Sequence, residues 1–388
     1  MKTYALRGTL VLPGRLAAGG LVIVDSERIA GILEPGAPPP LGPEQVLDYG
    51  DNFITPGLID LHLHGALGRD VIDGDVEGLR AIASHQARCG VTGFVPTTLS
   101  AAMSSILGAV RSVRSASGQA MPSEILGLYL EGPFLSAKKR GAHNPDFVKP
   151  IIPEDLEALV GSSRGLKTIL TVAPEAGDNL TFIPGLRERG LTVAIGHTEA
   201  TYELALRSFE LGVSHATHLY NAMSGFSPRE PGVIGAVLDA DSVTAEVIAD
   251  GIHVHPASLR IAVRQKGVSR ICLITDSMNA TGLADGEYRV GGLDVVLHGG
   301  EARLKEGGVL AGSVLSLNRA VRNIIEWTGV SVSDAVRMAS LTPAAVLGLD
   351  RELGSLAPGK LANLAVFDRE FNVVATVVRG RPLNHPPV

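Results

Sequence analysis

The middle of the chain alternates short apolar runs with segments of helical periodicity. The apolar runs are GLIDLHL, GVTGFVPT, EILGLYL, KTILTVA, LTVAIG, GVSHAT, TAEVIAD and ICLIT, and the helical segments include VEGLRAIASHQARCG, SSILGAVRSVRSA, PEDLEALVGS, TYELALRSFELG and PASLRIAVRQKG. Continuous apolar runs of this length are typical of strands that are buried on both faces, as in a parallel sheet covered by helices. Eight β–α alternations predict a (β/α)8 TIM barrel, whose active site lies at the carboxyl ends of its strands. The alternative is an open doubly wound sheet, which normally carries a glycine-rich phosphate loop after its first strand, and DLHLHGALGRD is not such a loop.

Both ends of the chain have a different pattern, of short strands joined by turns. YALRGTLVLPG and GGLVIVDSERIAGIL precede the proline-rich PGAPPPLGP near the amino end, and GSLAPGKLANLAVFD and FNVVATVVRGRPL lie near the carboxyl end. We predict that residues 1–53 and 355–388 together form a small β-sandwich domain and that residues 54–354 form the barrel.

Composition excludes several classes of protein. The chain has 388 residues, a net charge of −6 and no basic run, so it lacks the electrostatic footprint of a nucleic-acid-binding protein. No apolar run approaches the ~18 residues of a transmembrane helix, and MKTYALRGTLVLPGR, interrupted by Arg7, does not resemble a signal peptide. Cys89 and Cys272 give no sign of a disulfide framework. We therefore expect a cytoplasmic protein that binds neither nucleic acid nor membrane.

The first apolar run ends in a pair of histidines. In an extended chain, residues i, i+2 and i+4 point to the same side, so Asp60, His62 and His64 face one way if this run is a strand. Two imidazoles at this spacing are either a fork that binds a metal or ordinary polar residues at the rim of a strand.

Other strand ends decide between these interpretations. Glu131 follows ILGLYL, His197 follows LTVAIG, His218 follows GVSHAT, and Asp276 follows ICLIT. In a barrel these points converge on one rim, where buried charges are costly unless they pair or bind a cation. Imidazole nitrogens and carboxylate oxygens are suited to zinc or a similar divalent ion.

Each of these residues also has a simpler interpretation. Glu131 could cap a turn, His197 could start a helix that Thr198 caps, His218 could be a satisfied core histidine, and Asp276 could belong to an Asx-turn. Five such coincidences at one end of five strands favour the metal site instead, with the histidine pair of the first run among its ligands.

The same residues carry a resemblance to a known family. A His-x-His that ends the first barrel strand, two later histidines and an aspartate at the last strand resemble the amidohydrolase superfamily. More narrowly, EGPF…GAHNP, IGHTEAT, THLYNAMS, REPGVIGAVLD, ADGIHV, TDSMNATG and LAGS, in this order, resemble the N-acetylglucosamine-6-phosphate deacetylase family. The resemblance covers the whole chain, including the terminal segments.

The resemblance implies a barrel with a small β-sandwich, a homodimer, and a divalent metal held by Glu131, His197 and His218. It also implies that Asp276 is the catalytic acid and base, which accepts a proton from the attacking water and returns it to the departing nitrogen. His143 in GAHN is the implied donor to the substrate carbonyl, although a structural role in a turn is the alternative.

Some members of the family replace the first-strand pair by amides and hold one metal. Because this chain keeps both histidines, we predict room for a second ion at His62, His64 and Asp276, with Glu131 bridging the two. One or two divalent ions per subunit are thus expected. Zinc is the first choice, and iron or another divalent ion is the alternative, because ligand type does not separate them.

The phosphorylated amino sugar needs further contacts. Arg229 in SPREPG is a positive fork suited to phosphate, and the resemblance implies that it reaches the neighbouring subunit's site; a surface ion pair with Glu230 is the alternative. His253 is expected to meet the phosphate or a ring hydroxyl. The remaining expected contacts are Ala142, the Asn221 and Ala222 backbone amides, and a loop at Leu310, Ala311 and Gly312.

Three rival functions stay open. The galactosamine-6-phosphate counterpart differs at one hydroxyl of the substrate, and nothing in the sequence excludes it. A D-amino-acid deacylase or a cyclic-amide hydrolase of the same superfamily would need no phosphate contacts. A non-catalytic scaffold typically loses metal ligands, whereas this chain retains all of those named above.

Overall fold

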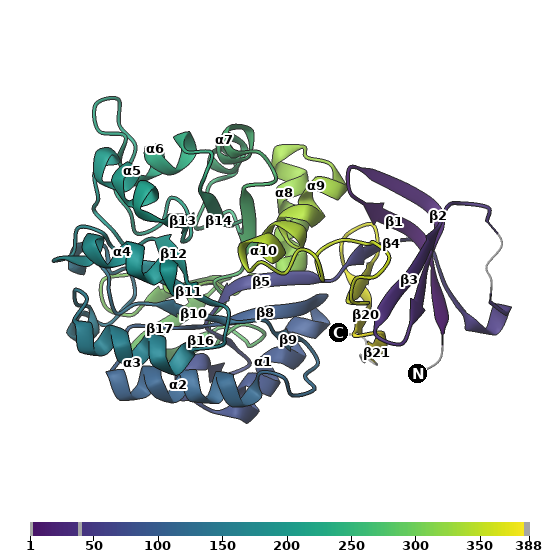
Figure 1. The fold of residues 1–388 in the computed structure, drawn as a ribbon, viewed down its shortest axis with the longest axis horizontal. Coiled ribbons are helices and arrows are strands. Elements are labelled where there is room, and N and C mark those ends of the chain that lie inside the picture. Colours follow the sequence, from purple (N-terminus) through teal and green to yellow (C-terminus); the bar gives the residue numbers. More distant parts are fainter. Residues whose placement is uncertain (1–2, 38–40, 384–388) are drawn as a thin grey trace.

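The computed structural model describes residues 3–37 and 41–383. Its core is a nearly closed barrel of eight parallel strands, one from each apolar run (Figure 1). In barrel order the strands are β5 (Leu58–Leu63), β8 (Val91–Thr98), β10 (Leu128–Glu131), β11 (Thr168–Val172), β12 (Thr192–Ile195), β13 (Val213–Ala216), β14 (Thr244–Ile248) and β15 (Ile271–Ile274). A short strand, β9 (Glu124–Ile125), pairs with β8. The predicted barrel is therefore confirmed.

Helices cover the outside of the barrel. They are α1 (Val76–Arg88), α2 (Met103–Ala116), α3 (Pro153–Ser163), α4 (Asn179–Glu188), α5 (Tyr202–Leu211), α6 (Gly232–Asp239), α7 (Pro256–Lys266), α8 (Leu317–Thr328), α9 (Val332–Met338) and α10 (Leu341–Val346). Every residue of β5, β8, β10, β11 and β15 is buried, between the helices on one side and the barrel interior on the other. This double burial explains why the runs are continuously apolar.

The barrel closes where its first and last strands meet. The Asp276 amide donates to the carbonyl oxygen of His62 at 2.9 Å. Below it, the buried carboxylate of Asp60 accepts from the Thr275 amide at 3.2 Å and from the Thr275 hydroxyl at 2.6 Å. Burial raises the pKa of Asp60 to about 7. Asp60 thus joins the two strands instead of entering the pocket, and the closure sets Asp276 beside His62.

The terminal segments form a second unit beside the barrel (Figure 1). Their strands make one seven-stranded mixed sheet, in the order β21 (Arg381–Leu383), β20 (Val373–Val378), β19 (Leu364–Phe367), β4 (Val46–Pro56), β1 (Tyr4–Leu12), β2 (Arg15–Asp25) and β3 (Arg28–Leu33). The pairing of β4 with both β1 and β19 joins the two ends of the chain, as predicted. The boundaries at residues 53 and 355 stay predictions, and β4 runs across the first of them.

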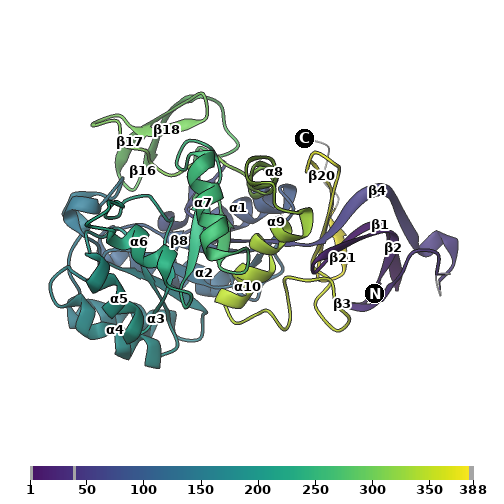
Figure 2. The ribbon, with the colours of Figure 1, turned by 90° about the horizontal axis from the view of Figure 1, so that it is seen from above.

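A three-stranded insertion follows β15. It consists of β16 (Gly286–Val290), β17 (Leu293–His298) and β18 (Glu301–Leu304), and it stands over one side of the barrel (Figure 2). It brings Val290, Arg303 and the following loop to the lining of a pocket at the carboxyl ends of the barrel strands. A second small element, the hairpin of β6 (Gly65–Ala66) and β7 (Arg69–Asp70), follows β5. None of the helices in the described ranges combines the length and the apolar character that a bilayer crossing requires.

Candidate metal centre

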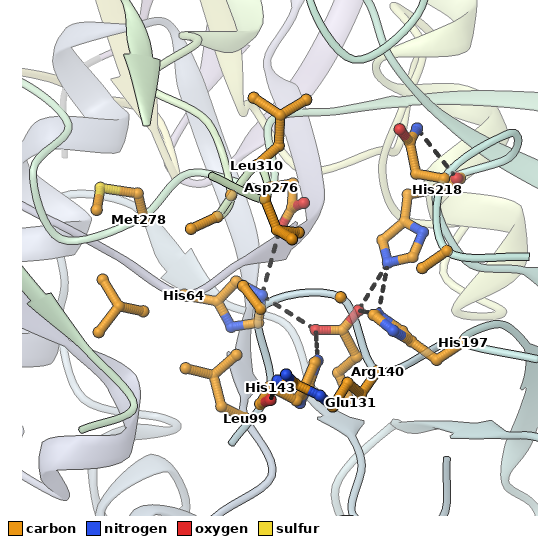
Figure 3. A pocket seen from close by; sticks show the side chains of 18 of the residues that line it. His64, Leu99, Glu131, Arg140, His143, His197, His218, Asp276, Met278 and Leu310 are labelled. Atoms are coloured by element: carbon orange, nitrogen blue, oxygen red, sulfur yellow. Dashed lines mark hydrogen bonds and ion pairs between the residues drawn. The ribbon is translucent and has the colours of Figure 1, made fainter. Parts of the chain in front are cut away.

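Two histidines from neighbouring strands meet one oxygen of Glu131. Nε2 of His197 and Nε2 of His218 lie 3.0 and 2.9 Å from Oε1 of Glu131, and 3.0 Å from each other (Figure 3). Metal–ligand lengths of about 2.0–2.2 Å place two ligands of a common ion about 2.9–3.4 Å apart. These three atoms therefore have the spacing of ligands around one divalent cation.

A second group lies on the other side of Glu131. Nε2 of His64 is 3.2 Å from Oδ1 of Asp276 and 3.2 Å from Oε2 of Glu131 (Figure 3). Nε2 of His62 is 3.3 Å from Nε2 of His64 and 3.6 Å from the same oxygen of Asp276. His62, His64 and Asp276 are all buried and could hold one ion together. Glu131 thus presents one oxygen to each group.

Outer contacts of the imidazoles fix which nitrogen faces the centre. Nδ1 of His197 donates to the carbonyl oxygen of Lys139 at 2.8 Å, and Nδ1 of His64 donates to that of Thr97 at 3.2 Å. A carbonyl can only accept, so each neutral ring carries its lone pair on Nε2, toward the centre. Nδ1 of His218 is buried without a partner among the described residues, so only Nε2 of that ring is engaged. The donor set therefore fits a divalent ion.

The buried carboxylates of Glu131 and Asp276 are stabilised by positive charge between the two groups of histidines. Burial alone would raise the pKa of Glu131, but the facing imidazoles, His62 foremost, hold that pKa well below its usual range. For Asp276 burial likewise acts upward, and close contact with His64 and the charge of His62 lower the pKa. A divalent cation supplies the charge without adding protons to rings that already donate from Nδ1.

His143 differs from the other pocket histidines. It lies close enough to Glu131 and His197 to share an ion with them. However, its Nδ1 accepts from the backbone amide of Ser100 at 3.1 Å, so the neutral ring carries its proton on Nε2. His143 therefore presents an N–H, not a lone pair, to the pocket, which makes it a hydrogen-bond donor.

Strained backbone is concentrated at these strand ends. His197, His218, Ala222 and Asp276 have φ angles of 47°, 28°, 49° and 51°, in the left-handed region that non-glycine residues seldom adopt. Such conformations cost about 1–3 kcal/mol each and persist where function requires the geometry.

The alternative that Thr198 caps a helix after His197 is wrong, because Thr201 caps α5.

All but two of the predicted site residues line one pocket of about 580 Å³ at the carboxyl ends of the strands. The members are His64, Glu131, Ala142, His143, His197, His218, Asn221, Ala222, His253, Asp276, Leu310, Ala311 and Gly312. His62 is completely buried behind this lining, and Arg229 is exposed and lies outside it. The pocket also contains Lys138, Lys139 and Arg140, whose approach the sequence did not indicate.

Comparison with known proteins agrees with this geometry. A profile of the Amidohydrolase family matches residues 53–383. The chain is 40% identical over 343 residues to N-acetylglucosamine-6-phosphate deacetylase of Vibrio furnissii, covering 88% of this chain and 84% of the relative. It is 38% identical over 340 residues to N-acetylgalactosamine-6-phosphate deacetylase of Escherichia coli O157:H7, covering 87% of this chain and 90% of the relative.

A solved structure extends the likeness over nearly the whole chain. It is a mutant N-acetyl-D-glucosamine-6-phosphate deacetylase from Mycobacterium smegmatis in complex with N-acetyl-D-glucosamine-6-phosphate, and it matches with a TM-score of 0.92 and 32% identity, covering 98% of this chain and 99% of that one. The chain belongs to the N-acetylglucosamine-6-phosphate deacetylase family. It is accordingly a hydrolase of the amidohydrolase superfamily, with two buried clusters suited to divalent metal.

In this deacetylase-family chain, hydrogen bonds within the protein hold the side of the pocket around His253 and Asn221. Nδ1 of His253 contacts a carboxylate oxygen of Asp250 at 2.6 Å, while the other Asp250 oxygen accepts the His253 amide at 2.8 Å. The Asn221 amide already donates to the His218 carbonyl, so of the two predicted anion-binding amides only that of Ala222 is uncommitted among the described residues. Asp250 was not predicted as a site residue, although it is the last residue of the apolar run TAEVIAD.

The loop at Leu310–Gly312 packs against the end of β15. A Cβ added at Gly312 would lie 2.9 Å from the Asp276 carbonyl oxygen, and the φ of this glycine is +62°. The Ala311 amide donates to Ala302 in β18 at 2.9 Å, which ties the loop to the insertion. Glycine is therefore required for the loop to approach Asp276 this closely.

Proposed function

We propose that this chain hydrolyses the acetamido group of N-acetyl-D-glucosamine 6-phosphate, giving D-glucosamine 6-phosphate and acetate. The observation that carries the proposal is the convergence of four imidazoles from three strand ends on Glu131 and Asp276, at a pocket in a deacetylase-family barrel. Removal of an acetyl group from an amide nitrogen needs an activated water, a polarised carbonyl and a proton for the leaving amine.

Glu131, His197 and His218 are proposed to hold one cation, and His62, His64 and Asp276 a second. Zinc is our first choice and iron or another divalent ion the alternative. When bound, such an ion supplies Lewis acidity, lowering the pKa of a water molecule from ~15.7 to about 7 and polarising a carbonyl oxygen.

Asp276 is the proposed general base and acid. Its carboxylate is ionised at neutral pH, since its pKa is lowered, and it lines the pocket beside His64. It accepts the proton of the attacking water and delivers it to the departing nitrogen. The contact through Oδ1 to the histidines leaves Oδ2 for this proton.

His143 is proposed to donate from Nε2 to the acetyl oxygen as negative charge develops there. We predict that His143→Ala lowers kcat by about 10²–10³-fold, the usual cost of one lost oxyanion donor, and leaves bound metal unchanged. Steady-state kinetics and metal analysis of the same preparation measure both. A loss of metal in step with activity would instead make His143 a ligand.

The phosphate end is proposed to lie at His253, Asn221 and the Ala222 amide, with Arg229 supplied by the other subunit of a homodimer. Arg229 is exposed, forms no ion pair within the described residues, and lies outside its own pocket, all of which suit a residue that serves a neighbour. The alternative ion pair with Glu230 does not form in the described structure.

We expect Arg229→Ala to raise KM for the phosphorylated sugar far more than KM for N-acetylglucosamine itself, since only the former has an anion for the guanidinium to bind. Kinetics on both substrates measure this difference. Arg207→Ala, which removes an exposed arginine paired with Glu210, is the control and should change neither KM. Equal effects of Arg229→Ala on both substrates would remove the phosphate role.

The second candidate is the galactosamine epimer, because one relative of 38% identity is named for it. Acetate release from N-acetylglucosamine 6-phosphate, its galactose epimer and the unphosphorylated sugar, with metal content measured on the same sample, tests the proposal. Faster turnover of the galactose epimer would favour the second candidate. If the unphosphorylated sugar is turned over as fast as the phosphorylated one, another amidohydrolase activity is favoured. If the protein has neither bound metal nor activity, a non-catalytic scaffold is favoured.

The proposed setting is the cytoplasm, where phosphorylated sugars are retained. Cys89 and Cys272 are both free, which suits a reducing compartment.

A further inference from the structure

A carboxylate with no assigned role lies behind the metal clusters. Glu246 is in the middle of β14, is completely buried, and does not line the pocket. Its strand is otherwise apolar apart from Thr244 at its start. A buried carboxylate is costly by several kcal/mol unless its oxygens are well satisfied, so its partners indicate what it does.

The first partner is a residue of the second cluster. Oε2 of Glu246 lies 3.0 Å from Nδ1 of His62. An ionised carboxylate can only accept, so His62 donates from Nδ1 and keeps its lone pair on Nε2, which is the nitrogen that faces His64 and Asp276. Both side chains are completely buried, so the contact is shielded from bulk water.

The second partner belongs to the other cluster. The backbone amide of His218 donates to the same Oε2 of Glu246 at 3.1 Å. His218 has a φ of 28°, so its backbone needs an external contact to remain in this conformation. One oxygen atom thus joins the ring of His62 to the main chain of His218.

The third partner holds Glu246 from behind. Nε2 of His215 contacts Oε1 of Glu246 at 2.9 Å, and Nδ1 of His215 contacts the hydroxyl of Thr244 at 2.6 Å. His215 is buried and outside the pocket, as expected of a satisfied core histidine. Protein groups therefore hold both oxygens of the Glu246 carboxylate.

We propose that Glu246 is a positioning residue, which orients His62 as a metal ligand and couples it to the His218 backbone. Binding of the second ion then depends on a carboxylate outside both ligand sets. This inference rests on the metal centre of the proposed function. Outer partners that accept from a ligating imidazole orient the ring and raise its basicity.

The experiment is a metal titration of the full chain after chelation. Co²⁺ binding is followed by visible absorption and calorimetry for the wild type, Glu246→Leu and Glu246→Gln. Leucine fills the space without an acceptor, whereas the glutamine carbonyl still accepts from His62. The control is Glu124→Gln, which changes a mostly buried carboxylate paired with Arg379 outside the pocket.

We expect the wild type and the Glu124 variant to bind two ions per chain. Glu246→Leu should weaken the second ion by about 10–100-fold, the usual effect of losing an outer partner, and the first ion less. Glu246→Gln should recover most of that loss. Circular dichroism of the metal-free proteins checks that each variant is folded.

Two results would overturn the inference while leaving the proposed function intact. One is wild-type affinity for both ions in Glu246→Leu, and the other is equal weakening in the leucine and glutamine variants, which would remove the role of the acceptor. A wild type that binds no divalent ion at all would overturn the proposed function and this inference together.

Discussion

Replacing Asp276 by asparagine is expected to lower kcat by roughly 10²- to 10⁴-fold, the contribution of a positioned general base and acid, while the protein keeps bound metal. Asparagine retains the shape of the side chain and an oxygen that can face His64, but it cannot take a proton from water at neutral pH. Glu131, His197 and His218 are unchanged in the variant, so at least one ion should remain. Acetate release and metal analysis on one preparation measure both quantities.

A suitable control for this prediction is Asp70→Asn. Asp70 is also a buried aspartate on the same side of the barrel, but it caps a short helix through the Ile72 amide and does not line the pocket. Asparagine is an equally good cap, so this variant should turn over at close to the wild-type rate. If Asp276→Asn also kept wild-type turnover, a group other than Asp276 would have to carry the proton from the attacking water to the leaving nitrogen.

The second large effect is expected from Glu131→Gln. The two oxygens of Glu131 contact imidazoles of both clusters, at 2.9–3.0 Å on one side and 3.2 Å from His64 on the other. An amide carries no charge and presents an N–H₂ group to one of the clusters. We expect cation affinity to fall by more than about 100-fold, since outer partners alone are worth about 10–100-fold, and activity to fall with it.

Metal content after dialysis and activity with excess metal test this prediction. Glu175→Gln is the matched control. Glu175 accepts hydrogen bonds from the Thr198 hydroxyl and the Glu199 amide, which are close to His197 in the chain, but Glu175 itself lies outside the pocket. That variant should retain metal. Full metal content in Glu131→Gln would mean that the two clusters do not share this residue.

The sequence predicted those features that depend on local pattern. Double burial makes most of the barrel strands largely apolar, so their alternation with helical segments could be recognised, and a polar residue directly after such a run, such as Glu131 or Asp276, stands out. The strands β16–β18 were not predicted, because they are short, half-exposed and outside the β–α repeat.

Features that depend on a partner from elsewhere in the chain could not be predicted. Glu246 is a single carboxylate inside an apolar run, and only the fold reveals that His62, His215 and the His218 amide surround it. Likewise, the commitment of the Asn221 amide to the His218 carbonyl follows from the turn geometry after β13, which the sequence did not specify.

The closure of the barrel has a consequence for synthesis of the protein. Asp60 and Thr275 hydrogen-bond across the closure although 215 residues separate them, and Asp276 and the first-strand histidines come together at this same junction. Such distant pairing forms late, because a long loop must close first. In the proposed metal centre, the second ion site would therefore stay incomplete until β15 has emerged from the ribosome, and acquisition of that ion would report closure of the barrel.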